Sequence, residues 1–243
     1  MDKKLIHSNN ILDGSKYATD FDYRMHHYCI NKFKKILLES NCLELGCYYG
    51  EMTKKLSRIC KNVTALDFDS KCVNETKKAC KKTKNVIVKK GDFFTYNNYK
   101  HHDVIYFSHS LEHIKNDRKL LDQIFNQMKK DSVLITIVPN GYSLSRQIAV
   151  KMGLIPSELV VTDFEKKIGH YRTYDMKTFQ SLFKEHDFSH FEFGGIMPKI
   201  FSNNQFDKCL KDGIINDSFL DALYQLSNKF SEICSSIYSI CRK

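Results

Sequence analysis

Acidic residues and glycines follow the short apolar runs in the first half of the chain. The stretch CLELGCYYGEMT places Glu44, Gly46 and Gly50 at the join between an apolar run and a helical pattern. Gly46 lets the backbone approach a ligand closely, and Gly50 removes a side chain where the helix starts. Asp67 ends the next apolar run 23 residues after Glu44, where its carboxylate can accept hydrogen bonds from both hydroxyl groups of a ribose. This spacing predicts a nucleoside-bearing ligand against the turn.

The third and fourth apolar runs also end in residues that suit such a ligand. Asp92 can bond the amino group of an adenine, while Phe93 packs on the face of the ring. Ser108 and His109 follow the fourth run. In an open parallel sheet, ligands bind beyond the carboxyl ends of the strands. Four consecutive strand ends with this content therefore predict one crevice that binds the nucleoside.

Three histidines are candidate catalytic residues: His109, His113 and His170. His109 and His113 follow the fourth strand, where the reacting group of the ligand is expected. Histidine is a common general base near neutral pH, because its ordinary pKa lies close to that value. Each histidine also has a structural interpretation. His109 can simply line the ligand, and His113 can brace the next helix, while His170 can pin its own segment to Glu165 or Asp175.

An irregular stretch over residues 156–175 is a natural wall for the pocket of a second substrate. His170 and Arg172 lie in it, and Arg172 can bind a phosphate or a carboxylate through two parallel hydrogen bonds. Arg172 can instead pin the stretch, as His170 can. Tyr174 and the N-terminal Tyr17 complete the predicted substrate-binding residues, with packing as the alternative role of Tyr174.

Apolar runs and helical patterns alternate from residue 41 onward. We expect strands at 42–46, 62–69, 85–92, 102–110 and 132–140, with helices between them, one of which starts at Ser70, a favourable N-cap residue. This alternation predicts an α/β fold with a mostly parallel sheet and helices on both faces. Two later strands, at 188–195 and 233–243, can pair antiparallel at one edge. The sheet would then have seven strands, the last of them antiparallel.

The chain shows no repeat, low-complexity tract or clear linker, so we expect a single domain over residues 1–243. Residues 1–40 form a predicted N-terminal helical lid segment. Its aromatic and polar residues can cover the ligand or belong to a surface helix; they are Tyr17, Tyr23, Arg24 and His26. Residues 140–175 form a predicted insertion on the substrate side, after the fifth strand.

The composition restricts the partners and the compartment. The 38 basic and 28 acidic residues give a net charge of +10, which favours an anionic partner. Many lysines fall in segment 71–90, where a solvated helix face explains them, and no nucleic-acid-binding module appears, so nucleic acid is not expected. The nine cysteines match no zinc or redox spacing, and no metal is predicted. No signal peptide or bilayer-length apolar run is present, which indicates reduced thiols in a cytoplasmic protein without a membrane span.

The order of these motifs resembles that of a known enzyme family. Glu-x-Gly-x-x-x-Gly, a strand-end Asp, Gly-Asp-Phe and SHSLEHI resemble successive motifs of class I S-adenosylmethionine-dependent methyltransferases over roughly residues 40–243. The resemblance implies a Rossmann-like fold, S-adenosylmethionine as the cofactor and S-adenosylhomocysteine as its product. Tyr48 departs from the family, whose turn often has a middle glycine. The cofactor-binding residues implied are Glu44, Gly46, Tyr48, Gly50, Asp67, Phe68, Asp92, Phe93 and Ser108.

An NAD-dependent Rossmann enzyme is the nearest structural alternative. Such an enzyme normally needs G-x-G-x-x-G before a helix whose N-terminus binds pyrophosphate. The segment GCYYGE does not fit that spacing, and Glu51 would repel a phosphate. S-adenosylmethionine carries no phosphate, so an acid is tolerable here.

Later segments resemble a subset of these methyltransferases that serve polysaccharide and capsule biosynthesis; they are SLEHI, VPN, GHYRTYD and GGIMPKIFSNNQF. We therefore expect O-methylation of a small-molecule acceptor, on a sugar hydroxyl or on a phosphoryl or phosphoramidate oxygen, so that an anionic acceptor stays open. The alternatives are a quinone or other lipid-like phenol, an RNA or protein substrate docked on the basic surface, and an inactive cofactor-binding scaffold. No oligomeric state is predicted.

Overall fold

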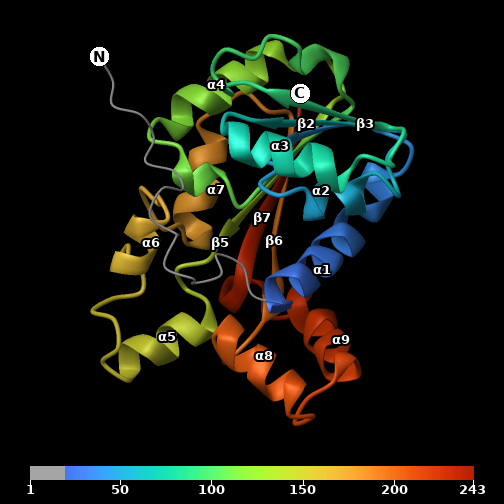
Figure 1. Ribbon diagram of the computed structural model, residues 1–243. Coiled ribbons are helices and arrows are strands. Elements are labelled where there is room, and N and C mark those ends of the chain that lie inside the picture. The colour runs from blue at the N-terminus through green and yellow to red at the C-terminus, as the bar shows by residue number, and fades with distance from the viewer. Residues whose placement is uncertain (1–19) are drawn as a thin grey trace.

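Seven strands form one mixed sheet in the order β3-β2-β1-β4-β5-β7-β6 in the computed structural model, which describes residues 20–243 (Figure 1). The strands are β1 (Asn41–Leu45), β2 (Asn62–Asp67), β3 (Val86–Lys90), β4 (Val104–Ser108), β5 (Val133–Pro139), β6 (His190–Pro198) and β7 (Cys234–Arg242). The first five strands are parallel, whereas β7 runs antiparallel to both β5 and β6. The predicted α/β fold with an antiparallel last strand is confirmed.

Helices connect these strands, one helix precedes β1, and several lie between β5 and β6. They are α1 (Asp20–Leu37), α2 (Glu51–Leu56), α3 (Ser70–Ala79), α4 (Asp117–Gln127), α5 (Leu144–Lys151), α6 (Asp163–Lys167), α7 (Met176–Lys184), α8 (Asn203–Lys211) and α9 (Asp217–Gln225), with a short 3₁₀ turn η2 (Leu111–His113) after β4. Helix α3 begins at Ser70, as predicted, but its N-cap is the preceding residue. Asp69 caps α3, because its carboxylate accepts hydrogen bonds from the N–H groups of Lys71 and Cys72.

Side chains of each central strand alternate between two apolar layers. Val104 and Tyr106 pack in the layer that contains α1, α2, α8 and α9, whereas Ile105 and Phe107 pack in the layer that contains α4 and α7. This alternation is the two-residue period of a strand, and burial of both faces explains why β4 is apolar up to Phe107. Helices therefore cover both faces of the sheet, as Figure 1 shows.

The strand order places the sheet's switch point between β1 and β4. The chain proceeds outward from β1 through β2 to β3 and then returns to the other side of β1 as β4. Leu45 is in register with Leu66 on β2 and with Phe107 on β4, so these three strands end at the same edge. Ligands of open α/β sheets bind in the crevice at such a switch point. The fold thus brings the predicted strand-end residues together.

Helix α1 is anchored to the last third of the chain. Phe21 stacks on Phe206 of α8 with ring centroids 4.6 Å apart, and the Tyr28 hydroxyl donates a 2.9 Å hydrogen bond to Asp221 of α9. Arg24 forms an ion pair with Asp217, so it points to α9. Within residues 20–243, no helix has the length and apolarity that crossing a bilayer requires.

Candidate active site

A cavity of about 1500 Å³ opens beyond the carboxyl ends of β1, β2 and β4. Pockets for one small ligand usually measure about 300–1,000 Å³, so this cavity has room for a cofactor and a second substrate. Most of the predicted site residues line it; they are Glu44, Gly46, Tyr48, Asp67, Phe68, Asp92, Phe93, Ser108, His109, His113 and His170.

The turn between β1 and α2 has a left-handed backbone at three positions, with φ of +83° at Gly46, +46° at Tyr48 and +84° at Gly50. A Cβ at Gly46 would lie 2.2 Å from the Ser110 hydroxyl oxygen, so glycine allows the Ser110 side chain to pack closely against this turn. Tyr48 occupies the middle position at a backbone angle that favours glycine. Its N–H donates to Asp67 and its ring stacks on that of Tyr49, with centroids 4.0 Å apart.

Gly50 has a structural role rather than a place in the cavity wall. It precedes α2, and a Cβ there would lie 3.1 Å from the Cα of Thr76 on α3. A side chain would therefore separate α2 from α3. The structure does not bring Gly50 into the cavity, and its predicted cofactor contact is replaced by this helix packing.

Glu44 is deeply buried near the end of β1, with 2% of its surface exposed. The Thr53 hydroxyl donates a 2.6 Å hydrogen bond to its carboxylate. Burial raises the pKa of Glu44 to about 8, opposed by the Thr53 bond and reinforced by the negative charge of Asp67. A positively charged ligand group beside Glu44 would restore its ionised form.

Asp67 is buried at the end of β2, and its carboxylate organises the adjoining turns. It accepts hydrogen bonds from the N–H groups of Tyr48 at 3.1 Å and Asp69 at 3.0 Å. The Asp92 carboxylate similarly accepts from the N–H of Phe94 at 2.7 Å. These bonds fix the direction of both acids, and both line the cavity.

Phe93 is held by its neighbours on the face of the sheet that carries α4. Its ring packs edge-to-face on Phe107, with centroids 5.7 Å apart. Its carbonyl accepts hydrogen bonds from the Tyr99 hydroxyl at 2.8 Å and the Gln123 amide at 3.1 Å. A rigid aromatic ring at this edge of the cavity is suited to stack against a flat heterocycle.

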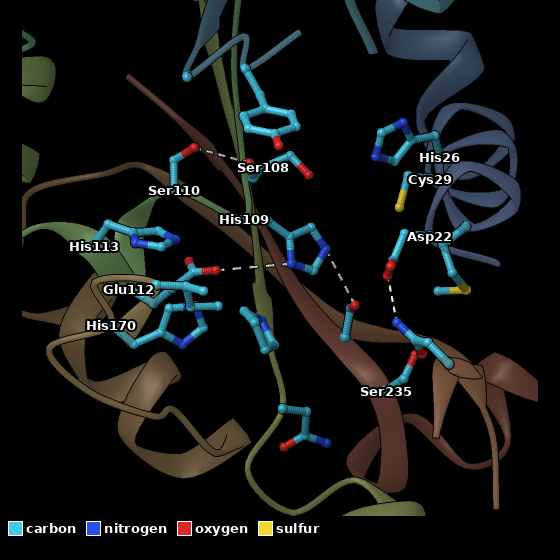
Figure 2. Close-up of a pocket in the computed structure, with 18 of the residues that line it drawn as sticks. Asp22, His26, Cys29, Ser108, His109, Ser110, Glu112, His113, His170 and Ser235 are labelled. Atoms are coloured by element: carbon cyan, nitrogen blue, oxygen red, sulfur yellow. Dashed lines mark hydrogen bonds and ion pairs between the residues drawn. The ribbon is translucent and has the colours of Figure 1, made fainter. Parts of the chain in front are cut away.

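His109 lies deeper in the cavity, directly after β4. Its backbone has φ of +49°, and its N–H donates a 2.8 Å hydrogen bond to the carbonyl of Ile137 on β5. The ring lies between Ser236, 3.5 Å from Nε2, and Glu112, 3.9 Å from Nδ1 (Figure 2). Although 39% of the side chain is open, the surrounding protein desolvates it and lowers its pKa to about 4.

Glu112, His113 and His170 form a cluster beside His109, which Figure 2 shows with the Glu112 carboxylate between the rings of the other two. The two imidazole rings are nearly perpendicular, with centroids 4.6 Å apart. Burial raises the pKa of Glu112 to about 8. Both histidines of this cluster were predicted as catalytic residues, whereas the glutamate between them was not.

Arg172 and Tyr174 point away from the cavity, so their predicted substrate contacts are not retained. Arg172 donates to the carbonyls of Ile114 and Lys115 and pairs with Asp117 at 3.0 Å. The Tyr174 hydroxyl donates a 2.8 Å bond to the same Asp117. Both side chains thus attach the 140–175 insertion to the start of α4. Asp117 gives their buried polar groups the hydrogen-bond partner that such groups need. Tyr17, the other predicted contact, lies outside the described residues.

Glu165 is held by two partners. Its carboxylate pairs with Arg146 of α5 at 2.7 Å, and Arg146 also donates to the carbonyls of Glu158 and Val160. Its carbonyl accepts a 2.9 Å hydrogen bond from the N–H of His170, one of the two residues expected to pin this stretch. Asp175 caps α7 through the N–H of Thr178. Gly169 then turns the chain at φ +93° after α6, which directs His170 toward the cavity.

Helix α1 and the segment after β6 also supply residues of the cavity. Tyr23 and His26 of the expected lid line it, together with Asp22, which was not predicted. Lys199 also lines it, although only 9% of this residue is exposed, and burial lowers its pKa to about 8. Its ammonium group binds Asn203, which in turn donates to Asp22. A buried lysine after β6 carries no local sequence signal, because its burial depends on contacts with α1 and α8.

These elements define a Rossmann-like fold with its ligand cavity at the switch point. Residues 21–191 match the family described as a methyltransferase domain, and the chain belongs to that family. The predicted class of enzyme is thereby confirmed. Among curated protein sequences, none matches the chain significantly.

Solved structures of methyltransferases share this fold at low sequence identity. An S-adenosylmethionine-dependent methyltransferase from Mesorhizobium loti has a TM-score of 0.62 at 12% identity and covers 92% of this chain and 100% of its own. A second, from Archaeoglobus fulgidus, has a TM-score of 0.57 at 17% identity over 91% of this chain and 94% of its own. The N-methyltransferase NodS from Bradyrhizobium japonicum, in complex with S-adenosyl-L-homocysteine, has a TM-score of 0.57 at 13% identity. The match covers 93% of this chain and 89% of NodS.

Proposed function

We propose that this chain transfers the methyl group of S-adenosylmethionine to an oxygen atom of a small-molecule acceptor and releases S-adenosylhomocysteine. One observation carries the proposal. Glu44 and Asp67, on adjacent strands, line the same large cavity as His109 and His170. The cavity therefore offers acids for a nucleoside-bearing cofactor at one end and proton-accepting nitrogens at the other. The family match and the neighbour solved with S-adenosylhomocysteine support the choice of cofactor.

The residues of the cofactor half fit an adenosyl thioether. Asp67 at the end of β2 would accept hydrogen bonds from the ribose hydroxyls, and Phe68 and Phe93 would contact the adenine. Gly46 and Ser110, which pack closely because Gly46 has no Cβ, would line the cofactor beside this turn. Asp92 would bond the adenine amino group.

The acid at the N-terminus of α2 argues against a dinucleotide cofactor. Glu51 is the first residue of α2 and lines the cavity. A helix N-terminus that binds pyrophosphate offers free N–H groups and a positive field, and a carboxylate at that position repels phosphate. S-adenosylmethionine has no phosphate, and its positive charges are compatible with Glu44 and Glu51.

When bound, the cofactor supplies an electrophilic methyl carbon on a sulfonium, which is transferred by direct displacement. The protein therefore mainly has to align the acceptor oxygen and exclude water. His109 is the proposed proton acceptor at its Nε2 atom, because this ring lies in the cavity wall between Glu112 and Ser236. Helix α1 and the 140–175 insertion form the walls that enclose the acceptor.

The acceptor that we propose is a sugar or phosphoryl compound of surface-polysaccharide or capsule biosynthesis. The support is the likeness of SLEHI, VPN and GHYRTYD to enzymes of that group. Lys199 supports an anionic acceptor, because a buried ammonium in the cavity wall would bind a phosphate or a carboxylate strongly. The nine cysteines are unpaired, which supports a reducing compartment such as the cytoplasm.

Calorimetry with S-adenosylhomocysteine tests the cofactor, and NAD serves as the matched control ligand. We expect one molecule of S-adenosylhomocysteine to bind per chain and NAD not to bind. Binding of NAD, or of neither compound, would contradict the proposal.

Transfer of a labelled methyl group to a panel of acceptors then tests the acceptor class. The panel contains a sugar, a sugar phosphate, a catechol-type phenol and an RNA. Methylation of the sugar or the sugar phosphate supports the proposed acceptor. Methylation of the phenol or the RNA instead would support the corresponding alternative and reject ours.

A further inference from the structure

We propose that Glu112, His113 and His170 bind a divalent first-row transition-metal ion at the acceptor end of the cavity. Each of these three side chains offers one potential ligand atom. Among residues 20–243, these three atoms form a group in which all lie within 4.8 Å of one another. Two imidazole nitrogens and one carboxylate oxygen are a ligand set that such ions accept. All three residues line the cavity, so an ion among them would be reached from the substrate side.

The glutamate provides the second, independent indication of a ligand. Glu112 is 98% buried, with a relative exposure of 2%, and its Oε2 atom has no hydrogen-bond partner among the described residues. An unsatisfied buried carboxylate oxygen costs free energy, because it has lost its water and gained nothing in return. Figure 2 shows the carboxylate directed between the rings of His113 and His170. A cation bound there would satisfy that oxygen.

The backbone around the cluster holds the three residues from two distant segments. Glu112 and His113 lie on the 3₁₀ turn after β4, whereas His170 belongs to the 140–175 insertion. The N–H of Tyr171 donates a 2.9 Å hydrogen bond to the carbonyl of Glu112, and Arg172 donates to the carbonyl of Ile114. His170 is thereby bracketed on its C-terminal side by two bonds to the same turn. One bond between backbone groups and one bond from the Arg172 guanidinium therefore position the segment that carries His170.

The distances require only a small contraction around the ion. With metal–ligand bonds of about 2.0–2.1 Å in a tetrahedral site, ligand atoms lie about 3.3 Å from one another. The ligand atoms now lie within 4.8 Å of one another, and on metal binding rotation of the imidazole and carboxylate groups would bring them to that value. Three protein ligands leave at least one coordination position free, as in metal sites that bind a substrate. An acceptor oxygen would take this position, and this last step rests on the proposed function.

Binding of Co²⁺ to the full chain, freed of metal by a chelator, tests the site. The visible absorption of Co²⁺ reports coordination by nitrogen and oxygen ligands. We expect one Co²⁺ per chain and at least about 100-fold weaker binding in His170→Ala and Glu112→Gln, since loss of even a supporting residue typically costs 10–100-fold. His101→Ala is the matched control, because His101 is exposed before β4, at the opposite end of the strand. Its Co²⁺ affinity should equal that of the natural chain.

Two results would overturn the proposal. One is absence of Co²⁺ binding by the natural chain, and the other is equal Co²⁺ affinity in all the variants. His170→Glu separates a ligand from a packing residue, because a carboxylate can coordinate where alanine cannot. His170→Glu should therefore bind Co²⁺ more tightly than His170→Ala does. Equally weak Co²⁺ binding by the two variants would reject His170 as a ligand.

Calorimetry with S-adenosylhomocysteine on the chelated protein keeps the two proposals separate and reports folding of each variant. Cofactor binding without Co²⁺ binding rejects the metal site and leaves the proposed function in place. Co²⁺ binding without cofactor binding rejects the proposed function and leaves the metal site in place.

Discussion

The backbone N–H of Tyr171 donates a 2.9 Å hydrogen bond to the carbonyl oxygen of Glu112. This bond joins the insertion after β5 to the turn after β4, two segments that meet only in the folded protein. Arg172 reinforces the junction with bonds to the carbonyls of Ile114 and Lys115. His113 and His170 approach each other at this junction. The part of the cavity that we propose to bind the acceptor is therefore built there.

Replacement of Arg172 should loosen the junction. Arg172→Ala removes two bonds to carbonyls and leaves the largely buried Asp117 without its cation, at a cost of about 2–4 kcal/mol in the free energy of unfolding. Urea unfolding measures this loss. The KM for the acceptor should rise as well, because His170 is no longer positioned. Unchanged stability and an unchanged acceptor KM would show that the junction does not depend on Arg172.

Asp67→Ala should abolish tight cofactor binding. A carboxylate that accepts hydrogen bonds from ribose hydroxyls contributes roughly 3 kcal/mol, so affinity for S-adenosylhomocysteine should fall at least about 100-fold. Circular dichroism should show a folded protein. Asp187→Ala removes an exposed acid after α7 and serves as the control. Calorimetry that gives the same affinity for Asp67→Ala and Asp187→Ala would exclude Asp67 from the cofactor site.

His109→Ala tests the proposed proton acceptor. Loss of a general base typically lowers turnover by about 10²–10⁴-fold, and the affinity for S-adenosylhomocysteine should stay within error of the natural value. Single-turnover methyl transfer separates the chemical step from binding. Full activity of this variant would assign proton removal to another group, or indicate an acceptor oxygen that is already anionic.

Lys199 tests the charge of the acceptor. Lys199→Met keeps an apolar chain of similar length but removes the ammonium group, so the KM for an anionic acceptor should rise by about 10-fold or more, while a neutral acceptor is unaffected. Lys199→Arg should retain part of the affinity. Steady-state kinetics with a sugar phosphate and the parent sugar make the comparison, and equal effects on both would reject an anionic acceptor at Lys199.

Glu44 should make the cofactor-free protein less stable at high pH. Its pKa is raised from 4.5 to about 8, so the folded chain binds this proton more tightly than the unfolded chain does. The resulting contribution to stability is complete below pH 4.5 and is lost as the pH rises to about 8. In Glu44→Gln, which keeps an acceptor for the Thr53 hydroxyl, this decrease should be smaller by roughly 2–4 kcal/mol. Urea unfolding between these pH values measures the free energy of unfolding of both proteins. Parallel plots of this free energy against pH would contradict the raised pKa of Glu44.

Elements with strong local patterns were predictable from the sequence. β4 is apolar from Val104 to Phe107 because both its faces are buried. Asp67 is the last residue of β2, and Asp92 lies two residues after the end of β3. The cap of α3 was placed one residue late, since Asp69 and Ser70 are both good N-cap residues and only backbone geometry distinguishes them. The domain organisation over residues 1–243 and the roles of the individual site residues stay predictions.

The sequence by itself determined the α/β class, the antiparallel last strand and the polar residues at the strand ends, because periodicity and strand-end chemistry are local properties. Tertiary structure alone decided that Arg172 and Tyr174 bind Asp117 rather than a substrate. It also decided that Lys199 is buried in the cavity wall and that Glu112 lies between His113 and His170. The physical reason is that burial and pairing of a polar side chain depend on partners far away in the chain. A sequence window contains no information on which of those partners will be near.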